Sequence, residues 1–148
     1  MGLPELPWHT PEITGILPHR APFLLVDSVL SVEPDRRIVG EKSWGLEESL
    51  VRTPQGRAMV PATLLMESLA QLGAILILMK EENQGKIIYF MGIDKVRYRR
   101  PVLGGERARM NATVVRLRSR VGTLSGEAYV DGRLVANGTM TFALGAEA

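Results

Sequence analysis

The sequence predicts an α+β domain in which an antiparallel sheet wraps around one long central helix. The first observation is the segment Pro61–Asn83, PATLLMESLAQLGAILILMKEEN, which is apolar on nearly every face of a helix. The second is a set of β-branched, partly alternating runs before and after it. A helix that is apolar all round must be buried, and strands on both sides of one helix favour a sheet folded over it.

The predicted helix has start and stop signals. Pro61 stands at its beginning, and Gly85 follows its polar end. The unbroken apolar run Leu72–Met79 is too short for a bilayer, which needs about 20 residues. Glu67 and Gln71 also lie inside the pattern. We therefore expect a buried helix and no membrane span.

The flanking runs are predicted as strands. Phe23–Val32 and Arg37–Trp44 precede the helix. Five runs follow it: Lys86–Met91, Lys95–Tyr98, Ala108–Arg118, Thr123–Val130 and Leu134–Leu144. Asp131-Gly132 predicts a two-residue hairpin turn, and Ser119–Gly122 predicts another turn. Such a sheet leaves an edge open, which a second copy commonly closes, so we expect a dimer.

Length and composition limit the possible chemistry. The chain has 148 residues, 45% hydrophobic and 23% charged, which suits one globular domain. Residues 1–12 form a Pro-rich N-terminal arm without the features of a secretory signal, so we expect a cytoplasmic protein. With no cysteine and only two histidines, the chain is expected to hold no metal and no cofactor.

The charge is concentrated in one segment. Residues 95–120 carry nine Lys or Arg side chains and one acid, whereas the remainder carries nine basic and fifteen acidic groups. Such a segment favours an acidic partner, and a solvated strand face is the simpler interpretation. The sequence has no helix-turn-helix, zinc-finger or RNA-binding signature, so nucleic acid is not expected.

Three long motifs resemble one enzyme family. LPHRAPFLLVD (Leu17–Asp27), PATLLMESLAQ (Pro61–Gln71) and YFMGIDKVRYRRPVLGGERARM (Tyr89–Met110) are similar to the signatures of FabZ-type (3R)-hydroxyacyl-acyl-carrier-protein dehydratases. The resemblance runs from about Ile13 to Leu144. It implies the hotdog fold, a dimer or trimer of dimers, and a hydro-lyase acting on acyl-carrier-protein thioesters in fatty-acid or related lipid biosynthesis.

The resemblance also implies a catalytic pair from opposite protomers, in which a histidine takes the C2 proton and a glutamate helps to expel the 3-hydroxyl. Glu67 matches the glutamate, but the position of the histidine falls on Thr53. The motif glycine, whose N–H polarises the thioester carbonyl, falls on Ala62. This sequence therefore resembles a divergent member of the family that lacks the motif histidine.

Neither of the two histidines is an obvious replacement. His19 belongs to the LPHR motif, where we expect it to form structural hydrogen bonds, and His9 lies in the N-terminal arm. Glu67 is either a general acid or base, or a remnant paired with Arg57 or Gln71.

The resemblance assigns further residues to binding. They are Ala62 at the thioester site and Tyr89 and Phe90 in the tunnel wall. Met59 and Met66 are interpreted first as core residues, with the lining of a pliable acyl tunnel as the alternative. The expected docking charges for the acidic acyl carrier protein are Lys95, Arg97, Arg99 and Arg100.

Three functions remain open from the sequence. The first is a dehydratase whose missing base comes from water, Thr53 or a paired homologue that carries the histidine. The second is a non-catalytic subunit that binds acyl thioesters, carried by acyl carrier protein or coenzyme A. The third is a hotdog thioesterase in which Glu67 activates water.

Overall fold

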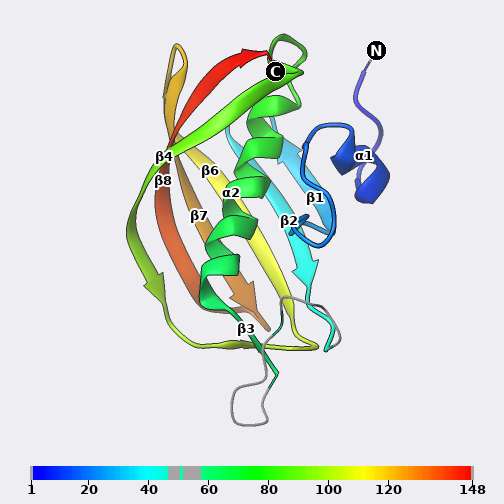
Figure 1. Ribbon diagram of the computed structural model, residues 1–148, viewed down its shortest axis with the longest axis vertical. Coiled ribbons are helices and arrows are strands. Elements are labelled where there is room, and N and C mark those ends of the chain that lie inside the picture. The colour runs from blue at the N-terminus through cyan, green and yellow to red at the C-terminus, as the bar shows by residue number, and fades with distance from the viewer. Residues whose placement is uncertain (1, 47–50, 52–57, 148) are drawn as a thin grey trace.

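One long helix, α2 (Ala62–Leu78), packs against the inner face of a six-stranded antiparallel sheet in the computed structural model (Figure 1). The structure describes residues 2–46, 51 and 58–147. The sheet contains, in spatial order, β1 (Ser28–Glu33), β2 (Arg37–Ser43), β6 (Arg107–Arg118), β7 (Val121–Val130), β8 (Arg133–Glu147) and β4 (Lys86–Tyr98). The predicted α+β hotdog architecture is confirmed. The edges of this sheet are β1 and β4.

Short turns connect β1 to β2, β6 to β7 and β7 to β8. At the β7–β8 hairpin, Asp131 and Gly132 have φ values of 50° and 76°. Asp tolerates the left-handed region and Gly adopts it freely, so this dipeptide suits a two-residue hairpin turn. The predicted turn at this position is confirmed.

Several predicted boundaries differ from the structure. The strand expected over Phe23–Val32 begins only at Ser28. The two runs expected over Lys86–Met91 and Lys95–Tyr98 form one continuous strand, β4, whose pairing with β8 contains three register shifts. Bulges break the alternation of side chains, so one bulged strand has the sequence pattern of two.

The helix is also shorter than predicted. It ends at Leu78, and a separate 3₁₀ turn, η2, covers Glu81–Asn83. The Asn83 side chain donates a hydrogen bond of 2.9 Å to the Ile77 carbonyl. This bond satisfies a carbonyl in the last helical turn, where no further helical N–H follows.

Two smaller elements complete the fold outside the main sheet. The short strands β3 (Met59–Val60) and β5 (Val102–Leu103) pair with each other and bring the start of α2 beside Arg99–Pro101. The N-terminal arm is anchored, because Trp8 is buried and pairs through its backbone with Val29. It leads into the short helix α1 (Thr10–Thr14).

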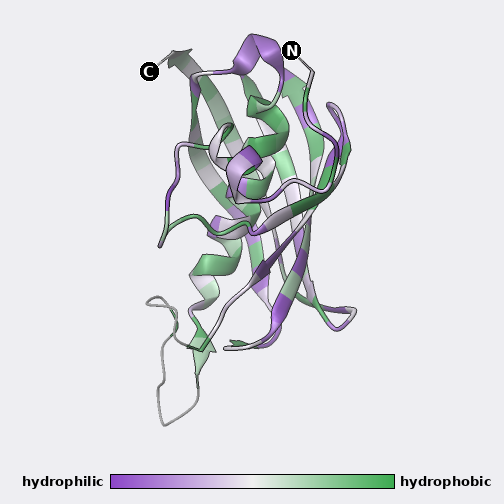
Figure 2. Cartoon of the chain, turned by 90° about the vertical axis from the view of Figure 1, so that its right-hand side faces the viewer, coloured by the Kyte–Doolittle hydropathy of each residue, from purple (hydrophilic) through white to green (hydrophobic). Residues whose placement is uncertain are grey.

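The core lies between α2 and the sheet. Figure 2 shows α2 coloured largely as hydrophobic, and its side chains pack with those of β2, β6, β7 and β8. Among the described residues, no helix has the length and hydropathy needed to cross a bilayer.

Gly40 permits the closest approach between β2 and α2. A Cβ at this position would lie 2.7 Å from the Ser28 carbonyl oxygen and 2.8 Å from Cδ1 of Leu72. The carbonyl belongs to the paired strand β1 and cannot move without disturbing the ladder. The absence of a side chain at residue 40 therefore lets β2 lie close to both β1 and α2.

We predict that Gly40→Ala lowers the free energy of unfolding by about 1–3 kcal/mol, the usual cost of overpacking. Urea denaturation followed by circular dichroism measures this difference. The control is Gly92→Ala, because a Cβ on Gly92 would meet nothing within 4 Å. Equal losses in the two variants would contradict the steric argument.

Candidate functional site

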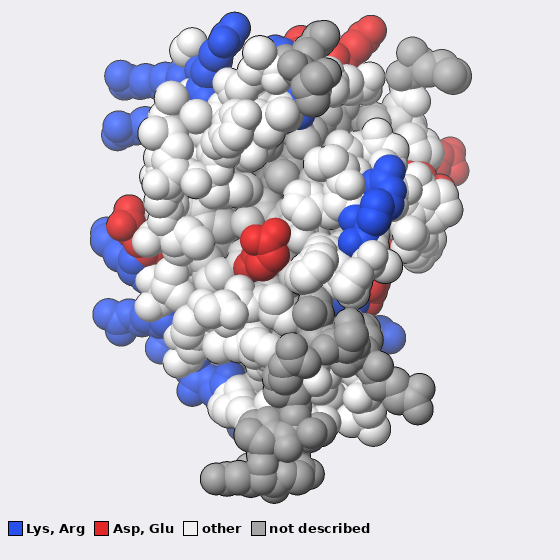
Figure 3. Space-filling view, in the orientation of Figure 1, with Lys and Arg blue, Asp and Glu red and all other residues white. Residues whose placement is uncertain are grey.

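Glu67 is the one place where the middle of α2 reaches the surface. Every other residue from Leu65 to Met79 is buried, whereas the Glu67 side chain is 48% exposed. It is also the only charged residue of the helix. Figure 3 shows one acidic patch over α2, surrounded by uncharged surface. The fold therefore presents a single carboxylate in an apolar setting.

The buried amide of Gln71 sets the position of this carboxylate. Gln71 Nε2 donates to Glu67 Oε1 at 2.9 Å and to the Phe23 carbonyl at 2.8 Å, while its Oε1 accepts from the Leu25 N–H at 2.7 Å. Residues i and i+4 lie on one helix face, which brings the two side chains together. The pairing of Glu67 with Gln71, one of the options from the sequence, is present.

The loop that precedes β1 places a histidine opposite Glu67. The Arg20 guanidinium donates to the carbonyls of Thr14, Leu17 and His19, at 3.1, 2.8 and 2.8 Å. These bonds hold the LPHR motif in a fixed bend. As a result His19 Nε2 lies 3.8 Å from Glu67 Oε1.

Three adjoining cavities follow the exposed face of α2. One, of about 360 Å³, is lined by His19, Glu67 and Phe90. The next, of about 350 Å³, shares Glu67 and Phe90 and adds Met66 and Tyr98. Because neighbouring cavities share lining residues, they form an interrupted groove with Glu67 at the junction of these two.

The third cavity, of about 480 Å³, lies at the start of α2. It is lined by Met59, Ala62, Arg99 and Arg100, and it shares Tyr98 with the second cavity. No side chain caps the helix at Pro61. The first N–H groups and the positive end of the helix dipole therefore remain available to an electronegative atom.

Two ionisable groups at this end have shifted pKa values. Burial raises the pKa of the Tyr98 hydroxyl, so at neutral pH it stays protonated and can donate a hydrogen bond. The hydrogen bond from Arg100 lowers the pKa of the Glu106 carboxyl, and these side chains form an ion pair at 3.2 Å. Arg100 is therefore partly neutralised, whereas Arg99 is exposed.

The structure brings together some of the expected site residues. Glu67, Met66 and Phe90 line one cavity, and Met59 and Ala62 line the cavity at the helix start. The Tyr89 ring lies on the other side of β4, beside Gly145 of β8, and is 57% exposed.

The remaining expected residues lie apart from Glu67 or outside the described structure. Lys95 and Arg97 are exposed on β4, further along the strand from the helix start than Arg99. Thr53, the position of the motif histidine, and Arg57 are outside the described residues. Basic side chains follow the margin of Figure 3 on the side where Figure 1 shows β4.

Sequence reasoning gave little weight to two residues of this region. For His19 a structural role was favoured over a catalytic one, yet it faces Glu67. No role was predicted for Tyr98 in the third motif, although it lines two of the cavities. Both residues lie in motifs that were recognisable in the sequence. Nothing in those motifs indicated that either residue lies close to the helix.

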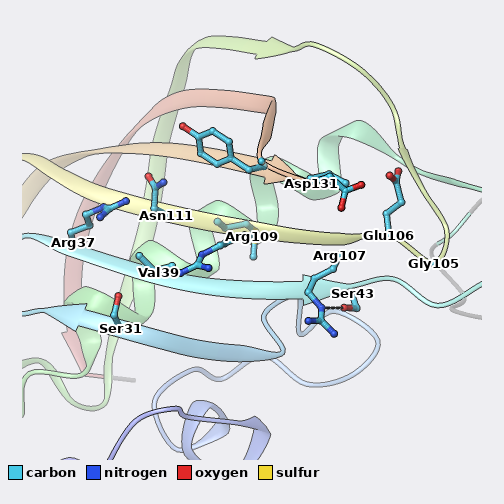
Figure 4. Close-up of a pocket in the computed structure, with 14 residues that line it drawn as sticks. Ser31, Arg37, Val39, Ser43, Gly105, Glu106, Arg107, Arg109, Asn111 and Asp131 are labelled. Carbon is cyan, nitrogen blue, oxygen red and sulfur yellow. Dashed lines mark hydrogen bonds between the residues drawn. The ribbon is translucent and has the colours of Figure 1, made fainter.

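A wider groove of about 940 Å³ lies on the outer face of the sheet (Figure 4). Its lining includes Arg37, Arg107 and Arg109, but no residue of α2. Arg107 lies 3.7 Å from the Glu41 carboxylate and 3.3 Å from the Ser43 hydroxyl. These alternating charges are typical of a solvated strand face, and the groove has no connection with Glu67.

The described residues contain no cluster of three or more His, Cys, Asp or Glu side chains that could bind a metal ion. The chemically active groups that line the groove are the Glu67 carboxylate, the His19 imidazole and the backbone N–H groups at the start of α2.

The fold and this groove define a hotdog protein with a carboxylate on its central helix. Residues 17–139 match the FabA-like domain family, and the chain belongs to the FabZ-type branch of that family. The 3-hydroxyacyl-[acyl-carrier-protein] dehydratase FabZ of Moorella thermoacetica is 46% identical over 134 residues, which cover 90% of this chain and 94% of that protein.

Solved structures support the same fold. The dehydratase heterocomplex ApeI:P from Xenorhabdus doucetiae superposes with a TM-score of 0.80 at 16% identity, covering 97% of this chain and 93% of the other. A hypothetical thioesterase with coenzyme A from Streptococcus pneumoniae has a TM-score of 0.62 at 12% identity, with coverage of 80% and 85%. At these identities the likeness shows the fold alone.

We predict that Gln71→Leu lowers the free energy of unfolding by about 1–3 kcal/mol, because the Leu25 N–H and the Phe23 carbonyl lose their partner. Urea denaturation measures the loss. Gln84→Leu, at an exposed position beyond α2, is the matched control and is expected to change little. Equal stability of the Gln71→Leu and wild-type proteins would show that water replaces the amide.

Proposed function

We propose that this chain is a cytoplasmic 3-hydroxyacyl-acyl-carrier-protein dehydratase that holds the acyl chain along α2 and uses Glu67 to expel water. One observation carries the proposal. Glu67 is the only exposed residue between Leu65 and Met79, and it lies where two cavities of the groove meet. A groove with apolar walls and a few fixed polar groups suits a lipid-like substrate that reacts at one position.

The start of α2 is suited to the thioester carbonyl. Removal of a proton from C2 moves negative charge onto this oxygen, so stabilisation is needed mainly in the transition state. The uncapped N–H groups near Ala62 and the helix dipole supply it. The Tyr98 hydroxyl, which lines the same cavity, is a further donor.

The acyl chain then extends past Glu67. The carbon that carries the 3-hydroxyl lies two bonds from the carbonyl carbon, so a thioester at the helix start brings this hydroxyl towards the carboxyl group. Protonated Glu67 donates its proton to the departing oxygen, which leaves as water. Gln71 keeps Glu67 in the rotamer that faces the groove.

A second candidate is an accessory subunit that binds acyl thioesters without transforming them. The sequence contains no histidine beyond His19, so the position of the motif histidine is not occupied by one. Such a subunit would pair with a homologue that carries the missing base.

We also propose that β4 pairs with another hotdog chain. It is an edge strand of 13 residues, and Tyr89, Met91 and Ile93 on it are 57%, 65% and 49% exposed. An exposed apolar edge strand of this length favours pairing with a strand of another chain. Ile93 also lines the groove beside Glu67, so a partner at this edge would help to close it.

We predict that Glu67→Gln lowers the rate of enoyl-thioester formation by about 100-fold or more, because general acid catalysis contributes at least this much. The assay incubates the chain with 3-hydroxyacyl-acyl carrier protein and follows the absorbance of the enoyl product. Gln retains the size of the side chain and can still bond to Gln71.

Glu81→Gln is the control, since Glu81 is an exposed carboxylate outside the groove. Release of free thiol without enoyl product would favour a thioesterase. Binding of the thioester without either product would favour the accessory subunit. Undiminished enoyl formation by Glu67→Gln would exclude Glu67 as the acid.

We predict that Arg99→Glu weakens binding of acyl carrier protein, because it reverses a charge beside the helix start where the acidic carrier would dock. The expected effect is a higher KM for the carrier-bound substrate and a weaker dependence on salt. The activity on a small thioester without carrier should fall less than the activity on the carrier-bound substrate. The matched control is Arg118→Glu, at the β6–β7 hairpin. Equal effects of the two variants would indicate non-specific attraction.

A further inference from the structure

The contact between His19 and Glu67 brings together, within one subunit, an imidazole and a carboxylate that line the same cavity. The imidazole Nε2 lies 3.8 Å from the carboxylate Oε1, and the side chains are 35% and 48% exposed. Both line the same cavity of about 360 Å³. Neither group is sealed in the core, so a substrate in the groove can reach both.

A purely structural role for His19 finds no support in its hydrogen bonds. Its Nδ1 is buried and has no hydrogen-bond partner among the described residues. The bend of the loop is held instead by the Arg20 guanidinium, through three backbone carbonyls. A buried unpaired nitrogen lowers stability, so the imidazole at this position needs a reason other than loop structure.

No other charged group that lines the cavity, among the described residues, can take the place of His19 or Glu67. Its lining also contains Arg20, which is engaged with the loop carbonyls, and Lys86 at the start of β4. Glu67 is the only carboxylate among the lining residues that the structure describes. A neutral imidazole is thus the one lining group that can accept a proton while Glu67 donates one.

We propose that His19 is the proton acceptor of this site and takes the part that the family motif would assign to a histidine at residue 53. This inference rests on the proposed dehydratase function. The C2 hydrogen and the C3 oxygen are on adjacent carbons, so acceptor and donor can act from the same side only if they lie close together. The distance between His19 and Glu67 meets this requirement.

The reaction then balances within one chain. The lone pair of His19 Nε2 takes the C2 proton, and the electrons of the C2–H bond form the C2=C3 double bond. The C3–O bond breaks, and the oxygen takes the proton of the Glu67 carboxyl group and leaves as water. The imidazolium finally returns its proton to the Glu67 carboxylate across their contact.

The test compares His19→Gln and His19→Gly with the matched control His9→Gln. We expect both His19 variants to form enoyl product about 100-fold or more slowly, while acyl-carrier-protein binding is retained and His9→Gln behaves as wild type. Free imidazole should restore activity to His19→Gly in a concentration-dependent manner. A structural role would produce no such rescue.

A second measurement avoids any folding defect of the His19 variants. In His9→Gln, His19 is the only histidine of the chain. The loss of dehydration activity should then be proportional to the fraction of His19 that diethyl pyrocarbonate has modified. Hydroxylamine, which removes the modification, should restore the activity. Full modification with retained activity would overturn the proposal.

Failure of this inference and failure of the proposed function give different results. Enoyl formation that is unchanged in both His19 variants overturns the role of His19 and leaves the dehydratase function standing. Absence of enoyl product from the wild-type chain overturns both. Enoyl formation only after addition of a homologue with the motif histidine overturns the His19 proposal and supports the accessory subunit.

Discussion

The hydrogen bonds of Gln71 connect the parts of this protein that form its groove. Gln71 is 2% exposed and lies in an apolar helix, where an unpaired amide would be costly. Its bonds to Phe23 and Leu25 fix the loop that carries His19, and its bond to Glu67 fixes the carboxylate. One buried side chain thus satisfies its own polar atoms and aligns two segments that are far apart in the sequence.

These bonds explain which features could be predicted from the sequence. The helix was recognisable because it is apolar on nearly every face. The strands were recognisable by β-branched residues and a partial alternation of apolar and polar residues. The boundary at Phe23–Asp27 was predicted wrongly, because the backbone of Phe23 and Leu25 pairs with a side chain of α2 rather than with a neighbouring strand. A local pattern of β-branched residues cannot distinguish these two partners.

The same limit applies to the candidate site. Glu67 stood out in the sequence because a carboxylate in an apolar helix is unusual. His19 did not, since its proximity to Glu67 depends on contacts between residues more than 45 positions apart and on the bend that Arg20 holds. Motif resemblance directed attention to residue 53, while the fold brings a different histidine to the carboxylate.

The position of Glu67 follows from how the sheet covers α2. The strands enclose one side of the helix, and the loop with His19 covers part of the other, so the exposed strip runs from Ala62 and Thr63 to Glu67. The edge strand β4 forms the remaining wall of this strip through Phe90, Val96 and Tyr98. The wall of the groove is therefore also the open edge of the sheet. A copy or homologue paired at β4, as proposed, would cover apolar surface and enclose the groove in a single step. Because His19 and Glu67 already meet within one chain, such a partner would be needed to shape the acyl site but not to supply the base.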